Sequence, residues 1–267
     1  MESGSGHDRV QSKAVANDRD LPGRAFKVLG EDLSRQDLAL RREVKFLLPG
    51  ADVGTLRSLM ECNGRRLVHN EPVSTVRSVY FDDVRLSDCQ ANLDGISRRR
   101  KVRLRWYDSL DPGHVLFFEI KWRDNRVVGK HRLELRTQQP VSELTYRQVI
   151  DNLIDALPPQ HVGDLLERNE PIVIVEYKRE HFESPDGRVR VTLDYDLAFY
   201  DQTGKQYLST SFPHRLPNMF VLEAKGPQGF EEEVKELLYP FAPRMGSCSK
   251  YVHGCQQLGL VPSRNYH

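Results

Sequence analysis

The stretch RRRKVRLRWY, residues 98–107, carries six Lys or Arg in its first eight positions and ends on two aromatic residues. From position 101 onward charged and apolar residues alternate, which is typical of a strand whose two faces meet different surroundings. One face would carry Lys101, Arg103 and Arg105, and the apolar residues between them would form the other. The whole chain is nearly neutral, with 39 Lys and Arg against 38 Asp and Glu. Positive charge must therefore be segregated within the fold.

The composition predicts a folded protein of ordinary size. The chain has 267 residues and 39% hydrophobic content, enough for one large core. Its net charge of +1 argues against a generic nucleic-acid-binding protein, so we expect no nucleic-acid partner. The four cysteines form no CxxC pair, which argues against a zinc knuckle or a disulfide scaffold and favours a reduced, cytoplasmic setting. We find no signal peptide and no apolar run near the roughly 18 residues of a membrane span.

The chain divides into a tail, one domain and a short end. Residues 1–36 are rich in Ser, Gly, Asp and Arg and predict a disordered N-terminal tail. Residues 37–262 predict a single domain, followed by a C-terminal tail at 263–267.

Eight strand-like segments dominate this domain. Several are separated by turn sequences such as DPGH and SPDGR. The segments lie at residues 41–48, 74–82, 101–107, 115–123, 127–135, 172–180, 188–195 and 218–225. Helical patterns fill residues 52–62, 142–157 and 229–241, the second opening with a loose capping spacing from Ser142 to Thr145. We therefore expect an α+β fold, a closed or nearly closed antiparallel barrel of eight strands with flanking helices.

The alternation of charge recurs on strand after strand and has two interpretations. In the ordinary one, the charged faces point to water and the apolar faces fill the barrel. In the inverted one, the apolar faces lie under the helices and the charged faces line a polar channel. Such a channel must be wet or occupied, because unpaired buried charges cost several kcal/mol each. Periodicity alone does not decide between them.

The order of the segments favours the inverted barrel. RREVKFLL, SVYFDD, KVRLRWY, FFEIKWR with VGKHR, VEYKREHF, RVRVTLDYDL, VLEAK and SCSKYVHG follow one another from residue 41 to residue 254. Together they resemble the VTC domain, the polyphosphate polymerase branch of the triphosphate tunnel metalloenzymes, also called CYTH-like proteins. The resemblance implies an eight-stranded antiparallel β tunnel with a charged interior.

The resemblance also implies an activity. A VTC domain is a phosphotransferase that adds the γ-phosphate of ATP to a growing polyphosphate chain, with Mn²⁺ or Mg²⁺ as cofactor. ATP and inorganic polyphosphate are therefore the expected partners. The residue types suit this chemistry, since phosphoryl transfer depends on positioning and on charge neutralisation. Arg binds phosphate oxygens in pairs, and Lys supplies a point charge.

The resemblance implies roles for individual residues. Arg103 and Arg105 match paired strand arginines that grip the β- and γ-phosphates, and Lys121 matches a tunnel lysine. Tyr177 and Arg179 match a contact to the transferring phosphate. The catalytic group is thus Arg103, Arg105, Lys121 and Arg179.

Further matches concern substrate and metal. Lys45 ends the first-strand motif, and Lys130, with Arg132 as its alternative, matches another tunnel lysine. Ser249 and Lys250 match a late phosphate contact near the tunnel mouth. Glu223 matches the metal-binding carboxylate, a hard oxygen ligand.

One departure from the wider superfamily favours the polymerase. That superfamily opens with Glu-x-Glu-x-Lys, whereas Arg41 here precedes Glu43 and Lys45, which weakens the expectation of a second metal ion. The alternatives are a triphosphatase, in which water is the attacking group, and a polyphosphate-binding module without catalysis.

Other residues have simpler interpretations. Residues 98–100 are expected before the strand, as a basic collar on the surface or at a tunnel entrance. Cys248, Cys255 and His253 match no zinc pattern. Asp194 is a minor candidate for the tunnel, or else a strand terminator.

Overall fold

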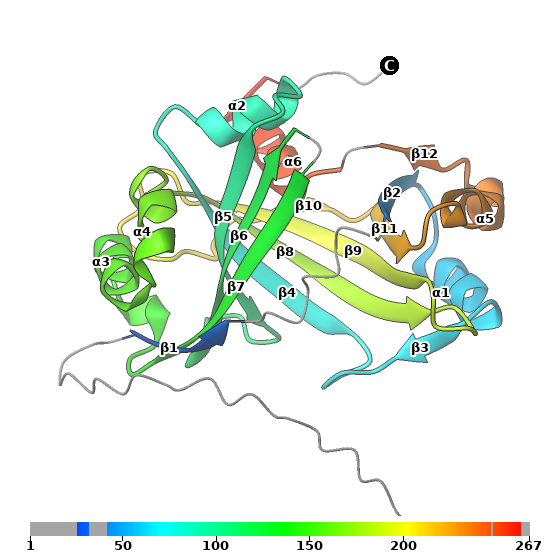
Figure 1. Cartoon of the computed structure of the whole chain (residues 1–267), viewed down its shortest axis with the longest axis horizontal. Coiled ribbons are helices and arrows are strands. Elements are labelled where there is room, and N and C mark those ends of the chain that lie inside the picture. Colours follow the sequence, from blue (N-terminus) through cyan, green and yellow to red (C-terminus); the bar gives the residue numbers. More distant parts are fainter. Residues whose placement is uncertain (1–25, 32–41, 126, 247, 263–267) are drawn as a thin grey trace, which may run out of the picture.

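The computed structural model describes residues 26–31, 42–125, 127–246 and 248–262. These residues form one twelve-stranded antiparallel sheet with helices packed on it (Figure 1). The strands are β1 (Phe26–Glu31), β2 (Arg42–Pro49), β3 (Arg65–Leu67), β4 (Ser74–Asp82), β5 (Arg99–Tyr107), β6 (Val115–Asp124), β7 (Val127–Thr137), β8 (Glu170–Glu183), β9 (Arg190–Asp201), β10 (His214–Leu216), β11 (Met219–Gly226) and β12 (Arg244–Met245). The α-helices are α1 (Val53–Cys62), α2 (Ser87–Leu93), α3 (Tyr146–Ala156), α4 (Pro159–Leu166), α5 (Phe230–Leu238) and α6 (Lys250–Gln257), with 3₁₀ turns at Val141–Glu143 and Tyr239–Phe241.

The strand order corrects the predicted barrel. The order is β1-β7-β6-β5-β4-β8-β9-β11-β2-β12, with β10 on β9 and β3 on β8. All eight predicted strands are present, and four short strands, β1, β3, β10 and β12, add to them. Within the described residues the hydrogen-bonded path runs from β1 to β12 without closing a ring. The antiparallel sheet with flanking helices is confirmed. The sheet formed by the described residues has twelve strands and is not closed, so an eight-stranded barrel is not confirmed.

The sheet curves strongly, so that strands far apart in its order face each other. Figure 1 shows β5, β6 and β7 crossing β8 and β9 at a steep angle. Lys121 of β6 reaches Glu43 of β2, with Nζ 3.5 Å from Oε1, although five strands separate β6 and β2 in the sheet order. The inner face is therefore a partly enclosed space.

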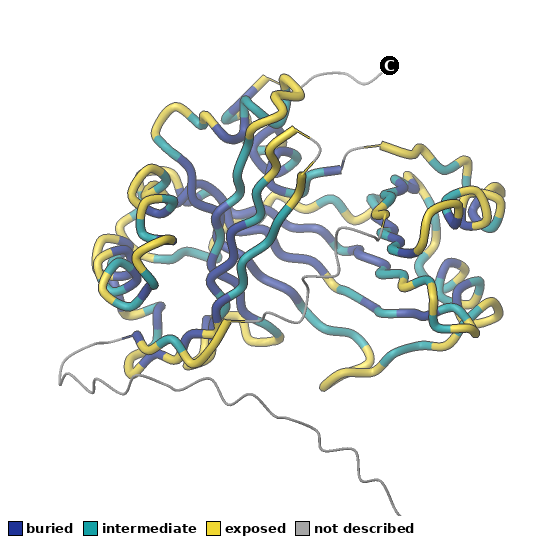
Figure 2. Tube along the Cα trace, viewed as in Figure 1, coloured by how far each residue is buried: buried dark blue, intermediate teal, exposed yellow. Residues whose placement is uncertain are grey.

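The apolar faces of the strands point outward, under the helices. Leu104, Phe118 and Leu133 of β5, β6 and β7 pack with Leu153 of α3 and Leu165 of α4. Burying each such side chain contributes about 1.5–3 kcal/mol. The central strands are the most buried part of the molecule (Figure 2). This packing selects the inverted interpretation of the alternation, in which the charged faces line the interior.

The other wall repeats this arrangement. Phe46 of β2 and Leu222 of β11 pack against Leu56 of α1 and Val234 of α5. Like the first wall, it turns its apolar side chains toward helices and leaves its charged side chains on the inner face.

Helix α6 lies on the inner side of the sheet. Tyr251 and Val252 pack on Val173 and Val175, which share the inner face of β8 with Tyr177. A Cβ atom at Gly254 would come within 2.8 Å of the Phe199 ring, so only glycine allows this close approach. Helix α6 therefore covers this part of the inner face.

Two of the predicted helices begin at identifiable caps. Asp52 accepts a hydrogen bond from the Thr55 backbone N–H at 2.7 Å and starts α1. Helix α3 starts one turn later than expected, because Thr145 and Gln148 form the capping box and Ser142 lies in a 3₁₀ turn. The predicted cap at Ser142 was therefore wrong. Among the described helices, none has the length and apolar character needed to cross a bilayer.

The predicted N-terminal tail needs a correction. Phe26–Glu31, placed in the tail over residues 1–36, form β1, which pairs with β7 and buries Phe26 in the core. The rest of that prediction, Arg41 and the C-terminal tail at 263–267 lie outside the described residues.

Candidate active site: the charged interior of the sheet

Rows of like charge cross neighbouring strands on the inner face. Arg99 of β5 lies opposite Arg123 of β6, and two residues further in Lys101 lies opposite Lys121. Lys130 of β7 extends the second row. Like charges directly opposite each other destabilise a sheet. Such rows are therefore typical of a surface that binds an anion.

Among the three lysines of the second row, Lys101 experiences this repulsion most strongly, since Lys121 and Lys130 each contact a carboxylate. Within the described part of the chain, no carboxylate lies within 4.0 Å of its ammonium group. Burial, together with Lys45 and Lys121, lowers the pKa of Lys101 to about 7. A bound anion would relieve the repulsion and keep the amine protonated.

The next row contains one carboxylate, Glu119, which contacts several cations. Its fully buried side chain accepts from Arg103 Nε at 2.7 Å, from Lys130 Nζ at 2.8 Å and from Arg132 Nη1 at 3.1 Å. Burial alone would raise the pKa of Glu119, but Arg103, Arg105 and Lys130 outweigh it and hold the pKa well below its usual range. Glu119 thus fixes the arginines in place without cancelling their charge. The sequence did not identify Glu119 as a site residue, although it lies two positions from Lys121 and on the same face of the strand.

Two carboxylates, Glu43 of β2 and Glu223 of β11, lie on the opposite wall. Lys45 Nζ lies 3.0 Å from Glu43 Oε1 and 3.2 Å from Glu223 Oε2, and Lys225 Nζ lies 2.6 Å from Glu223 Oε1. This follows from the register, because Glu223 pairs with Lys45 and Lys225 pairs with Glu43 across β11 and β2. Burial alone would raise the pKa of Glu223, but Lys45 and Lys225 outweigh this effect and hold the pKa well below its usual range. The carboxylate is ionised at neutral pH.

A third cluster forms around Asp194. Its buried carboxylate accepts from Arg179 Nε at 2.6 Å and from Lys250 Nζ at 2.5 Å. Burial acts against ionisation, but Arg179 and Lys250 lower the pKa of Asp194 to about 2. Asp194 lies within β9 and does not end a strand, so the alternative interpretation of this residue was wrong.

Tyr177 joins the Glu119 cluster to the Asp194 cluster. Its ring lies 4.7 Å from Lys250 Nζ and 5.1 Å from Arg179 Cζ, while its hydroxyl accepts from Arg105 Nη2 at 3.4 Å. The cation–π contacts hold these side chains at the ring face. Arg105, Arg179 and Lys250 are therefore presented together, although their strands and helix are distant in sequence.

A cavity of about 480 Å³ opens beside the rows of lysine and arginine. This volume lies in the range typical of small-molecule sites. Residues from both walls and from the start of α6 line it, among them Lys45, Arg99, Lys101, Lys121, Met245 and Ser249.

Arg99 and Arg100 belong to β5, so the prediction that they precede the strand was wrong. Arg99 faces the cavity with Lys101, while Arg100 pairs with Asp164 of α4 at 2.7 Å.

The donor set of Glu43 and Glu223 fits a hard divalent cation. Both carboxylates contact the same ammonium group, so they are neighbours, and Mg²⁺ in proteins is typically held by one or two carboxylates plus water and substrate phosphates. Among the described residues, no third acidic, His or Cys ligand joins them. The protein alone therefore offers an incomplete coordination shell that phosphate oxygens and water would complete.

The structure brings the predicted residues together. Charged side chains from β2, β5, β6, β7, β8, β11 and α6 face the interior or its mouth: Lys45, Arg103, Arg105, Lys121, Lys130, Arg132, Arg179, Glu223 and Lys250. Lys130 and Arg132 were predicted as alternatives for one position, whereas the structure shows that both point inward. Ser249 accepts from the Val252 backbone N–H and caps α6 while lining the cavity.

A cationic inner face with partnered carboxylates suits a protein that binds phosphate groups. Comparison with known families is consistent with this class: the VTC domain model matches residues 40–259. The chain belongs to the VTC domain family.

Comparison with individual proteins adds little beyond the family. A search of curated proteins found no match. Two similar solved structures are the PH1819 protein from Pyrococcus horikoshii OT3 and HpAC1 from Hippeastrum, described as a putative adenylyl cyclase with a dominant triphosphatase activity. The first is 12% identical, covers 82% of this chain and 98% of its own, and has a TM-score of 0.43. The second is 14% identical, covers 83% and 98%, and has the same TM-score of 0.43.

Proposed function

We propose that the protein is a metal-dependent polyphosphate polymerase that transfers the γ-phosphate of ATP to the end of a polyphosphate chain. The observation that carries the proposal is the row of Lys101, Lys121 and Lys130 on three adjacent strands. With Arg99 and Arg123 outside it and Arg103 and Arg132 further in, it places positive charge at successive depths. A linear polyanion requires this arrangement, because every phosphate unit carries charge.

The reacting phosphates would lie where the guanidinium groups gather. Arg103 and Arg105 would bind the β- and γ-phosphates, and Arg179 would bind the transferring group with Tyr177 beside it. These arginines are already fixed by Glu119 and Asp194, so little reorganisation is needed on binding. Lys45, Lys121, Lys130, Arg132 and Lys250 would hold neighbouring phosphates as substrate-binding groups. Ser249 would contact a phosphate near the mouth.

The carboxylates Glu223 and Glu43 would hold Mn²⁺ or Mg²⁺. When bound, the metal would neutralise phosphate charge and so favour attack by one phosphate on another. Lys45 and Lys225 occupy these carboxylates in the structure and would turn toward phosphate oxygens when a cation takes their place. No protein nucleophile is required, since the terminal phosphate oxygen of the chain attacks the γ-phosphorus and ADP leaves.

The experiment is incubation with γ-³²P-labelled ATP and Mn²⁺, with products separated on a polyphosphate gel. The proposal predicts a labelled ladder that disappears in Glu223→Gln and persists in Glu236→Gln, a variant of an exposed carboxylate on α5. Labelled orthophosphate without polymer would replace the proposal with a triphosphatase. Neither product, with polyphosphate still bound, would leave a binding module.

A further inference from the structure

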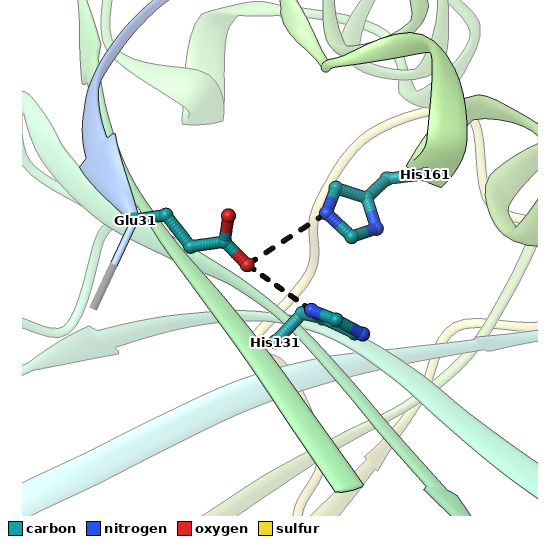
Figure 3. A group of neighbouring side chains, drawn as sticks. All are labelled: Glu31, His131 and His161. Atoms are coloured by element: carbon teal, nitrogen blue, oxygen red, sulfur yellow. Dashed lines mark hydrogen bonds and ion pairs between the residues drawn. The ribbon is translucent and has the colours of Figure 1, made fainter. Parts of the chain in front are cut away.

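Three metal-ligating side chains meet outside the charged interior. They are Glu31 of β1, His131 of β7 and His161 of α4 (Figure 3). His131 lies between Lys130 and Arg132 in sequence, and these two point inward, so alternation places His131 on the opposite face. The group is therefore separate from the proposed site of phosphate transfer.

A bulge in β1 aims Glu31 at this group. Val28 pairs with Leu135, but after the bulge Gly30 pairs with Glu134 and Glu31 with Leu133. Without the extra residue Glu31 would lie opposite Arg132 and point into the interior. The bulge therefore moves the Glu31 carboxylate to the outer face, next to His131, and bulges commonly re-aim a side chain in this way.

The distances are close to those of a metal centre. Glu31 Oε1 lies 3.1 Å from His131 Nδ1 and 3.9 Å from His161 Nε2, and all three ligand atoms lie within 4.8 Å of one another. Tetrahedral Zn²⁺ with bonds of about 2.0–2.1 Å separates its ligand atoms by roughly 3.3 Å. Small side-chain rotations are enough to reach that spacing.

His161 supplies an independent observation. The residue is only 3% exposed, and its Nε2 atom is buried without a hydrogen-bond partner among the described residues. A buried polar atom left unsatisfied costs about 1–3 kcal/mol. A hydrogen bond between His131 and Glu31 explains those two residues but leaves this nitrogen unexplained. A metal ion would use its lone pair.

We propose that Glu31, His131 and His161 bind Zn²⁺, with water as the fourth ligand on the exposed side of Glu31. Two imidazoles and a carboxylate suit a borderline transition metal better than Mg²⁺, which prefers oxygen ligands. The ion would tie the edge strand β1 to β7 and α4. It is distinct from the metal proposed at Glu223.

The test is titration of the purified full-length chain with Co²⁺, followed by competition with Zn²⁺. Wild type is expected to bind one Co²⁺ with the strong visible absorption of a tetrahedral N/O site and to lose it to Zn²⁺. Glu31→Gln and His161→Ala should weaken binding by more than about 100-fold, above the range typical of an outer-shell residue. The control His214→Ala, an exposed histidine on β10, should bind like wild type.

Two further measurements keep the result decisive. Glu31 is exposed, so Glu31→Gln should remain folded by circular dichroism, and Zn²⁺ should raise the melting temperature of wild type but not of this variant. Glu223→Gln should retain the Co²⁺ spectrum, which separates this site from the interior. Absence of a tetrahedral spectrum in wild type, or equal affinity in wild type and Glu31→Gln, would overturn the proposal. Neither result depends on whether the protein makes polyphosphate.

Discussion

Lys101 and Lys121 lie directly opposite each other on β5 and β6, inside the curved sheet and at the edge of its cavity. Two like charges in this position cost stability in the free protein. An anion bound between them would remove this cost.

Replacing Lys101 should change stability and binding in opposite directions. Lys101→Met keeps the length of the side chain and removes its charge, so the free protein should gain about 0.5–1 kcal/mol in free energy of unfolding. The dissociation constant for tripolyphosphate should rise roughly tenfold, equivalent to about 1.4 kcal/mol. Urea unfolding and calorimetric titration measure the two effects.

The matched control for this change is Lys178→Met. Lys178 is on β8 and pairs with Asp196 at 2.8 Å, both side chains being about half exposed. This variant should leave tripolyphosphate affinity unchanged. A Lys101→Met protein that is less stable than wild type and binds equally well would contradict the assignment of Lys101 to an anion site.

Binding of phosphate should take up protons. The pKa of Lys101 is lowered to about 7 by burial and by its lysine neighbours, and a bound polyanion would raise it. At pH 8 tripolyphosphate binding should therefore be accompanied by proton uptake, measurable by calorimetry in buffers of different ionisation enthalpy. Affinity should fall as pH rises from 6 to 9, and Lys101→Met should reduce the uptake.

The same pKa predicts how stability depends on pH without phosphate. The unfolded chain keeps this lysine protonated up to about pH 10.4, whereas the folded protein loses the proton near pH 7. Between these values the unfolded state binds more protons, so this group makes stability rise with pH. Lys101→Met should remove that part of the slope, and an unchanged slope would contradict the prediction.

Removal of the Glu223 carboxylate should separate metal binding from phosphate binding. In wild type Mn²⁺ should tighten tripolyphosphate binding, whereas in Glu223→Gln it should have little effect. Without metal, the variant should bind at least as tightly as wild type, because Lys45 and Lys225 lose a competing partner. Titrations with and without Mn²⁺ measure both effects, and a variant that loses metal-free binding would show that Glu223 acts differently.

Asp194→Asn should be strongly destabilising. Asp194 is fully buried between Arg179 and Lys250, and breaking such a group typically costs about 3–5 kcal/mol. Tripolyphosphate should stabilise this variant more than wild type, since phosphate would replace the missing negative charge. Melting curves with and without the ligand measure this difference, and an equal shift in both proteins would contradict it.

The central strands and the face of each charge could be predicted from the sequence because alternation has a period of two. Lys101, Arg103 and Arg105 share the inner face as the pattern required, and the outer face is covered by helices. The order of the strands in the sheet could not be predicted in this way. Whether the two ends of a curved sheet hydrogen-bond to each other depends on short strands such as β12 (Arg244–Met245). Strands this short carry almost no sequence pattern.

One part of the site was missed for a physical reason, and another was predicted only as a minor candidate. Glu119 and Asp194, respectively, gain their importance from cations on other strands, and sequence alone does not show which charges meet across a sheet. Likewise β1 is only six residues long and lies within a stretch that is otherwise rich in Ser, Gly, Asp and Arg. Its position becomes evident only from its pairing with β7.

The most direct test of the proposed polymerase is ³¹P NMR of the protein with ATP and Mg²⁺. The account predicts that the γ-phosphate signal of ATP declines while ADP signals and a signal from internal phosphates of a chain grow together. Growth of ADP and orthophosphate signals without internal phosphates, or a spectrum that does not change, would contradict it.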